Sequence, residues 1–165
     1  MRNSTKTLNK IYQPPPNKTG APLKNDWFRV EKQIGVSFPS DFKKIIEDYG
    51  SGCFGSFLFL LNPFENHADY DYLNDINQII DADMDFKSHR HFSKELFPLA
   101  STENGDTIYF KPGSSIESYE LYVFDSRRGN VEIHPIPLVQ FIVEWSLGRL
   151  KSNIIEAPDN THFKQ

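Results

Sequence analysis

The chain has 165 residues, 38% of them hydrophobic and 14% aromatic, which is enough to bury the core of one globular domain. Its single cysteine excludes an internal disulfide, and its longest apolar run is far too short to span a membrane. The formal charge of −4 hides an asymmetry: five of the 18 lysines and arginines precede Asp26, so the remainder has 13 bases, 22 acids and a formal charge of −9. An acidic body repels phosphate groups, which disfavours nucleic acid as a partner and favours basic proteins.

Residues 1–24 lack hydrophobic periodicity and contain Pro14-Pro15-Pro16, which is typical of polyproline II structure. The lysines of this segment are spaced, without the arginine clusters or interleaved aromatic residues of a nucleic-acid-binding arm. We expect a flexible, basic, proline-containing arm that is either mobile or held on the surface by Ile11 and Tyr12. The polar start does not resemble a signal peptide, so we expect a cytoplasmic protein.

A folded domain is predicted over residues 25–155, followed by a polar tail over residues 156–165. Its first helix begins near Asn25 or Asp26, either of which can cap a helix, and ends at Gly35. The apolar residues Trp27, Val30 and Ile34 share one face of this helix.

The second predicted helix begins at Pro39 and Ser40, because proline suits the first turn and a serine hydroxyl can cap a free amide. Gly50 supplies the left-handed residue that ends it. Its apolar residues recur at three- and four-residue spacing, which predicts one buried face: Phe42, Ile45, Ile46 and Tyr49. The short apolar run over residues 57–61 then predicts a buried strand.

An acid-rich segment follows Pro63, with no lysine or arginine before Lys87. Within this segment Leu73, Ile76, Ile79 and Ile80 have helical spacing, so we expect a third helix that exposes its acids to solvent.

From Leu96 onward the pattern changes to short strands separated by turn residues. The predicted strands are Phe97–Ser101, Thr107–Phe110, Glu120–Phe124 and Val131–Ile133, with turns at Asn104-Gly105, Pro112-Gly113 and Arg128-Gly129. A last helix begins near Pro137 and carries Leu138, Phe141, Ile142 and Trp145 on one face. The chain is therefore predicted to be a single α+β domain, with N-terminal helices and a C-terminal helix packed on a mainly antiparallel sheet.

Two polar clusters in the sequence contain residue types that bind metals. Asp81, Asp83 and Asp85 have the spacing that begins an EF-hand, but Phe86 and Phe92 occupy the positions that require glycine and a bidentate glutamate. A possible histidine pair, His89 and His91, has no accompanying ligands at a recognised spacing. We therefore predict that the protein holds no metal and no cofactor.

The sequence contains no recognisable catalytic constellation. It has no phosphate-binding glycine loop, nucleophile elbow or metalloprotease histidine pair. Cys53 lies between glycines beside a hydrophobic strand, which favours a buried, inert thiol over a nucleophile. Asn104-Gly105-Asp106 is accounted for by a type I′ hairpin turn in which Asp106 binds nearby backbone amides. An enzyme is therefore disfavoured.

Taken in order, several short motifs resemble the SUKH superfamily, the group of cell-wall-assembly regulators and immunity proteins. They extend from about Asp26 to Leu150, and their order and spacing carry the resemblance. They are Trp27 with Glu31 and Ile34-Gly35, Phe38-Pro39-Ser40-Asp41-Phe42-Lys43, Tyr49-Gly50-Ser51-Gly52, Leu61-Asn62-Pro63, Phe97-Pro98-Leu99-Ala100, Asn104-Gly105-Asp106 and the final helix.

The resemblance implies an α+β domain without enzymatic activity. Bacterial members of the superfamily are immunity proteins that bind and neutralise a cognate toxin, often a nuclease, whereas fungal relatives regulate cell-wall synthesis as signalling adaptors. The acidic body suits the first role, because a nuclease groove is basic and an acidic protein associates with it rapidly. The prediction is thus a toxin-neutralising immunity protein, and the alternative is a regulatory adaptor.

The favoured contact with a protein partner is the segment from Asp69 to Asp85, where tyrosines interleave with acids as they do in tight interfaces. The alternative is that these tyrosines pack on the sheet while the acids keep the protein soluble. The partner-binding residues predicted in this segment are Asp69, Tyr70, Asp71, Tyr72, Asp75, Asp81, Asp83 and Asp85. A second candidate surface is the concave side of the sheet around Asp106, Tyr109 and Tyr122.

Overall fold

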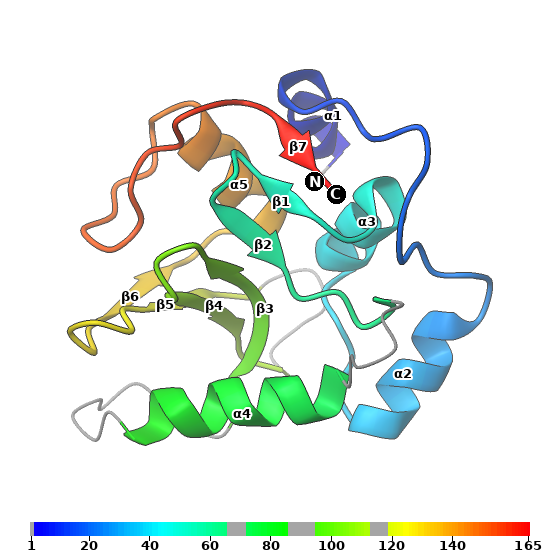
Figure 1. Cartoon of the computed structure of the whole chain (residues 1–165), viewed down its shortest axis with the longest axis horizontal. Helices are drawn as coiled ribbons and strands as arrows, with labels where there is room; N and C mark the ends of the chain where they lie inside the picture. Colours follow the sequence, from blue (N-terminus) through cyan, green and yellow to red (C-terminus); the bar gives the residue numbers. More distant parts are fainter. Residues whose placement is uncertain (1, 66–71, 86–94, 113–118) are drawn as a thin grey trace.

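The computed structural model describes residues 2–65, 72–85, 95–112 and 119–165, and its centre is one seven-stranded sheet. The strand order is β6-β5-β4-β3-β2-β1-β7, and every neighbouring pair is antiparallel (Figure 1). The strands are β1 (Cys53–Phe54), β2 (Leu58–Leu60), β3 (Phe97–Thr102), β4 (Thr107–Phe110), β5 (Leu121–Phe124), β6 (Val131–His134) and β7 (Phe163–Lys164). The predicted α+β class and antiparallel meander are confirmed. No helix in the described ranges is both long and apolar enough to cross a membrane.

Three helices cover one face of the sheet: α1 (Arg2–Ile11), α3 (Ser40–Tyr49) and α5 (Leu138–Ser146) (Figure 1). Alternate strand residues point toward these helices, among them Ile108 and Phe110 on β4 and their partners Val123 and Leu121 on β5. The apolar faces predicted for α3 and α5 are buried in the same cluster. The main core therefore lies between these three helices and the sheet.

Helix α2 (Asp26–Ile34) packs on the rim of this core through Trp27, whose ring contacts Phe38 at 5.5 Å between centroids and Phe64 at 4.7 Å. Glu31 accepts a hydrogen bond from the backbone N–H of Phe38 (2.8 Å) and pairs with Lys43 (2.5 Å). The residues of α2 and α3 that carried the family resemblance thus form one structural cluster.

The N-terminal segment contains a helix that the sequence did not predict. Leu8 and Tyr12 are fully buried at the contact between α1 and α5, and Tyr12 accepts a hydrogen bond from Ser146. The hydroxyl of Tyr49 donates to the carbonyl of Tyr12 (2.7 Å). A ten-residue helix of such polar composition is marginal alone, so the packing on α5 stabilises it. Residues 2–12 therefore pack on the fold, which agrees with the alternative of an arm held by Ile11 and Tyr12 rather than a mobile one.

Two glycines make room for the ends of the chain. A Cβ at Gly50 would lie 2.2 Å from the carbonyl oxygen of Thr19, and one at Gly52 would lie 2.2 Å from that of Lys164. The N–H of Ser51 donates to the Thr19 carbonyl (2.7 Å), while β7 pairs with β1. The predicted polar tail therefore ends in an edge strand, and the Tyr49-Gly50-Ser51-Gly52 motif is where both ends dock.

Helix α4 (Tyr72–Asp85) lies on the opposite side of the sheet from α1, α3 and α5 (Figure 1). Tyr72 and Ile76 near the start of α4 belong to the main core. Ile79 and Ile80 pack on a small second cluster, formed by Leu96, Tyr109 and Phe124 with the half-buried Tyr122 and Val131. These β4, β5 and β6 residues alternate with those of the main core. The sheet therefore has one fully covered face and one face that α4 covers over its central strands.

Candidate functional site

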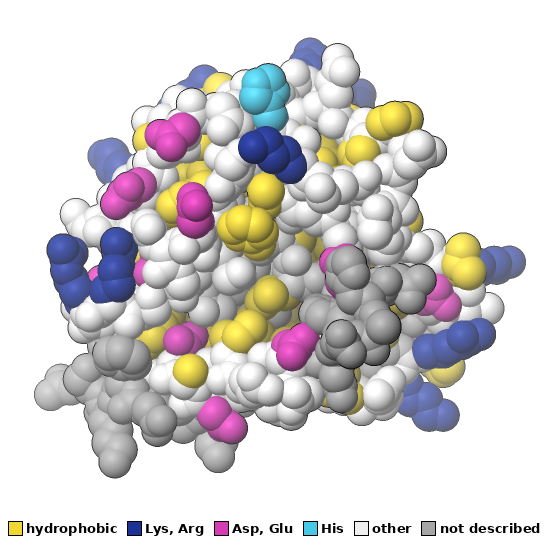
Figure 2. All heavy atoms as spheres, in the orientation of Figure 1, with side chains coloured by type: hydrophobic (Ala, Val, Ile, Leu, Met, Phe, Trp, Pro, Cys, Tyr) yellow, Lys and Arg dark blue, Asp and Glu magenta, His cyan; other side chains and the backbone are white. Residues whose placement is uncertain are grey.

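The acidic segment is described from Tyr72 onward, and it places two acids on the outer side of α4. Asp75 is half-buried and Asp81 is exposed. Acidic side chains are scattered over the whole face shown in Figure 2, along α4 and above it, with hydrophobic side chains visible between them. Asp69, Tyr70 and Asp71 lie outside the described residues, as does the side chain of Asp85.

Four residues predicted to bind a partner are buried instead. Tyr72 is 7% exposed and packs in the main core, whereas Asp83, Asp106 and Tyr109 are 6%, 0% and 0% exposed. Asp83, Asp106 and Tyr109 also form side-chain hydrogen bonds within the fold. Because all four side chains are buried, they are not available to a partner. Tyr122, which is half-buried, remains at the surface beside α4.

Asp83 anchors α4 to the sheet. The hydroxyl of Tyr109 donates a short hydrogen bond to the Asp83 carboxylate, and Thr107 provides a second side-chain hydrogen bond. Burial raises the pKa of Asp83 above its ordinary value, and the charge of Asp106 acts in the same direction. Burial and the adjacent carboxylate likewise raise the pKa of Tyr109, so its hydroxyl stays protonated as the donor.

The raised pKa of Asp83 predicts a pH dependence of stability. The carboxyl of Asp83 has a higher pKa in the folded than in the unfolded protein, where it lies near 3.8. The free energy of unfolding therefore falls as pH rises from 3.8 through the pKa of the folded state, because the folded protein then has to bury a charged carboxylate. We expect Asp83→Asn, whose amide oxygen can still accept from Tyr109, to unfold at a higher temperature than wild type at neutral pH. The difference should disappear below pH 3.8, where both states of wild type are protonated. Melting curves across pH test this; a constant difference at every pH would contradict it.

Asp106 connects two loops. Its carboxylate accepts hydrogen bonds from the hydroxyl of Thr102 (3.1 Å) and the N–H of Ser126 (3.2 Å), which belongs to the β5–β6 turn. The N–H of Thr102 donates to the carbonyl of Asp106, which leaves residues 103–105 as a three-residue loop of the β3–β4 hairpin. In this loop Gly105 donates to the Thr102 carbonyl and has φ 87°, whereas Asn104 has no positive φ. This is a type I turn with a glycine bulge, which corrects the type I′ prediction.

The remaining sequence-predicted groups have no evident chemistry. Cys53 is buried, as predicted, and burial raises the pKa of its thiol, which disfavours the reactive thiolate. Asp81 and Asp83 lie in helix α4 rather than in a calcium-binding loop. His89 and His91 lie outside the described residues. Across the described ranges, no group of three or more His, Cys, Asp or Glu residues is placed to hold a metal ion.

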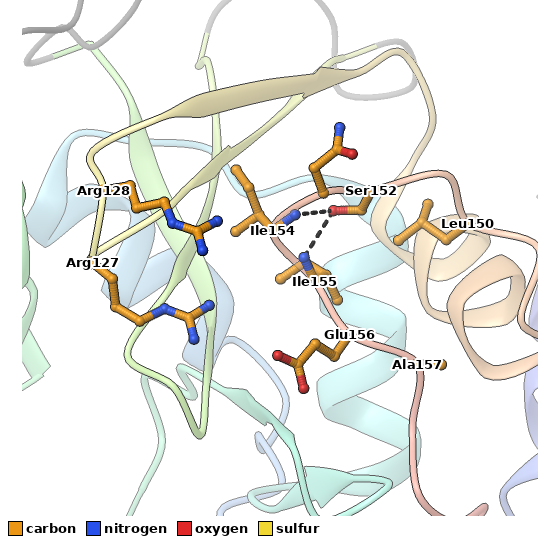
Figure 3. Close-up of a pocket in the computed structure, with 9 residues that line it drawn as sticks. Arg127, Arg128, Leu150, Ser152, Ile154, Ile155, Glu156 and Ala157 are labelled. Carbon is orange, nitrogen blue, oxygen red and sulfur yellow. Dashed lines mark hydrogen bonds between the residues drawn. The ribbon is translucent and has the colours of Figure 1, made fainter.

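The sequence interpretation missed a polar hollow of about 470 Å³ at the end of the β5–β6 turn. Arg127 and Arg128 extend from that turn toward a wall formed by residues 150–157, and Glu156 points back toward them (Figure 3). In the sequence, Arg128-Gly129 indicated only a turn. The two adjacent arginines in an acidic body are the signal that could have identified the hollow.

Comparison with known proteins supports the resemblance seen in the sequence. A family model described as SMI1-KNR4 cell-wall, SUKH_6, matches residues 24–139, which is more than half of the chain. The match begins after α1 and ends within α5. No curated protein and no solved structure matches the chain significantly.

Proposed function

Because the chain belongs to the SMI1-KNR4 cell-wall family of the SUKH superfamily, we propose that it is a non-enzymatic immunity protein. In this role it binds a cognate bacterial toxin in the cytoplasm and blocks it by surface complementarity. The proposed toxin carries a basic surface, as a nuclease does. The proposed contact is the accessible part of the segment from Asp69 to Asp85, without the buried Tyr72 and Asp83, and with Tyr122 beside it.

The acidic outer side of α4 is the observation that carries this proposal. The helix contains four aspartates and no lysine or arginine, and Asp75 and Asp81 remain accessible. A groove built for phosphate has the opposite charge, and opposite charges accelerate association between proteins. The bond between Asp83 and Tyr109 fixes the helix on the sheet, so little conformational freedom is lost when the acids meet a partner.

A regulatory adaptor of cell-wall synthesis is the second candidate, because the description of the matching family model names the cell wall. The genes beside this one distinguish the two roles. A large secreted protein with a variable C-terminal toxin domain, encoded directly upstream, would support immunity. Co-expression of that domain with this chain should then restore growth of cells that the domain alone kills. An isolated gene, or a toxin domain that still kills, would favour the adaptor.

The contact surface is tested by the kinetics of association with that toxin domain. The double variant Asp75→Asn/Asp81→Asn should associate roughly threefold to tenfold more slowly at low salt, since steering as a whole contributes about 10- to 1,000-fold. Wild-type association should slow toward the variant's rate as salt rises, because salt screens exposed charges.

A matched control removes the same charge on the other face of the sheet. Glu47 on α3 is exposed, like Asp81, and Glu144 on α5 is half-buried, like Asp75. The variant Glu47→Gln/Glu144→Gln should associate at nearly the wild-type rate. Equal rates for the two double variants, both fully folded by melting curves, would exclude α4 as the contact.

A further inference from the structure

We propose that the hollow between the β5–β6 turn and residues 150–157 binds a carboxylate of an acidic peptide segment, with Arg128 as the principal ligand. This site lies apart from α4, has the opposite charge preference, and does not depend on the toxin-neutralising role. A peptide carboxylate can come from an aspartate or glutamate side chain or from a C-terminus, and the experiment below distinguishes them.

The arginine wall is held rigid by a buried carboxylate. Asp125, 1% exposed, accepts hydrogen bonds from the backbone N–H groups of both Arg127 and Arg128, each at 3.0 Å. Its own carbonyl accepts the N–H of Gly129 (2.7 Å), which has φ 68°. Asp106 then joins this turn to the β3–β4 hairpin through the N–H of Ser126. The two guanidinium groups therefore extend from a fixed backbone.

The two arginines have different surroundings. The guanidinium of Arg127 lies 3.8 Å from Asp106 and 3.9 Å from Asp125, so those buried carboxylates offset its charge. Arg128 forms no ion pair with any carboxylate among the residues that the structure describes, and its side chain is directed into the hollow (Figure 3). Its planar guanidinium can therefore bind a carboxylate through two parallel hydrogen bonds.

The opposite wall is equally well ordered. The hydroxyl of Ser152 accepts the N–H groups of Ile154 (3.0 Å) and Ile155 (2.8 Å), as Figure 3 shows. Glu132 on β6 accepts from that hydroxyl (2.6 Å) and from the N–H of Asn153 (2.7 Å). With both walls fixed, the hollow can receive an amino-acid side chain or a chain end without rearrangement.

The surrounding charges favour a carboxylate over a phosphate. The buried Asp106 and Asp125 offset the charge of Arg127, so Arg128 is left to balance the ligand. One guanidinium neutralises a singly charged carboxylate but not a doubly charged phosphate. Glu156 also provides an acceptor across the hollow from the arginines, which suits a peptide whose backbone N–H or basic side chain follows the acid. These charges point to an acidic peptide segment rather than to a nucleic acid or a phosphorylated ligand.

Titration of the full-length protein with defined peptides tests this site. The probes are an N-acetylated, C-amidated tetraglutamate, an N-acetylated tetraglutamine whose only carboxylate is its C-terminus, the fully capped tetraglutamine, and inorganic phosphate. The readout is the NMR signal of each arginine Nε–H group. We expect the Arg128 signal to shift on addition of at least one carboxylate peptide, while the signal of Arg149, an exposed arginine after α5, stays in place. If the tetraglutamate shifts the Arg128 signal, the carboxylate comes from a side chain; if the tetraglutamine with a free C-terminus shifts it, the carboxylate comes from a chain end.

Arginine variants separate this site from general attraction to positive charge. Arg128→Gln should weaken binding by about tenfold or more, the loss expected when a charge-assisted pair is removed. Arg127→Gln should have a smaller effect, and Arg149→Gln should bind as wild type does. The proposal fails if neither carboxylate peptide moves the Arg128 signal, if the capped tetraglutamine or phosphate binds as tightly, or if folded Arg128→Gln binds with unchanged affinity.

Discussion

Trp145→Ala is expected to lower the free energy of unfolding by about 3–5 kcal/mol, the usual range for truncating a large aromatic side chain in a packed core. Trp145 is 1% exposed, lies on the buried face of α5 and packs on Phe57. Its Nε1–H donates to the carbonyl of Glu156 (2.6 Å). A Cβ at Gly55 would lie 3.0 Å from the indole ring, so the backbone fits tightly around this side chain. The residual cavity should therefore be large.

The measurement is thermal and urea unfolding of wild type and variant, and a fall in melting temperature of roughly 10 °C or more is expected. Trp145→Phe is the control, because it keeps most of the apolar surface but loses the bond to Glu156. It should lie between wild type and Trp145→Ala. A Trp145→Ala protein that melts like wild type would mean that α5 does not pack as the structure places it.

The second large effect is expected from Asp41→Ala. Helix α5 begins after Pro137 without a side-chain cap from its own neighbourhood. Asp41 on α3 supplies this cap: its carboxylate accepts the N–H of Val139 (3.0 Å) and the hydroxyl of Tyr119 (2.7 Å). Tyr119 in turn accepts the N–H of Leu138 (2.9 Å). Asp41 is 3% exposed, so its removal leaves buried donors without an acceptor, at about 1–3 kcal/mol each.

We therefore expect Asp41→Ala to lose roughly 2–5 kcal/mol of unfolding free energy, as two buried donors lose their acceptor. A double-mutant cycle with Tyr119→Phe separates the capping role from general loss of packing. Because the two residues act on the same helix start, the combined loss should be clearly smaller than the sum of the single losses. Strictly additive losses would show that Asp41 and Tyr119 do not act as one cap.

Much of the fold could be predicted from local pattern. The apolar periodicity of Phe42, Ile45, Ile46 and Tyr49 predicted α3, and the structure buries all four of these residues. Strand β4 has the predicted bounds Thr107–Phe110, because alternating apolar residues between turn signals are a local property of the chain. The family resemblance rested on the same local features, and the family match confirms it.

The candidate site was less predictable. Whether an acid of α4 is exposed or buried depends on its position around the helix axis and on how the helix packs on the sheet. Asp81 and Asp83 are two positions apart and so lie on different sides of α4. One reaches solvent and the other binds Tyr109, 26 residues away. A list of acids identifies an acidic helix, but only the packing of Ile79 and Ile80 on the sheet decides which acids face outward.

By itself, the sequence determined what depends on neighbouring residues: helices α2 to α5, strands β2 to β6, the glycines that end α2 and α3, the acidic body and the family. The tertiary structure decided what depends on contacts between distant residues. The two polar ends of the chain join the fold through such contacts: α5 covers Leu8 and Tyr12, and β1 pairs with Phe163–Lys164. The tertiary structure also turned Asp41 into the cap of a helix 98 residues away. The strength of such a contact depends on burial and on partners brought together by folding, and neither is encoded in local spacing.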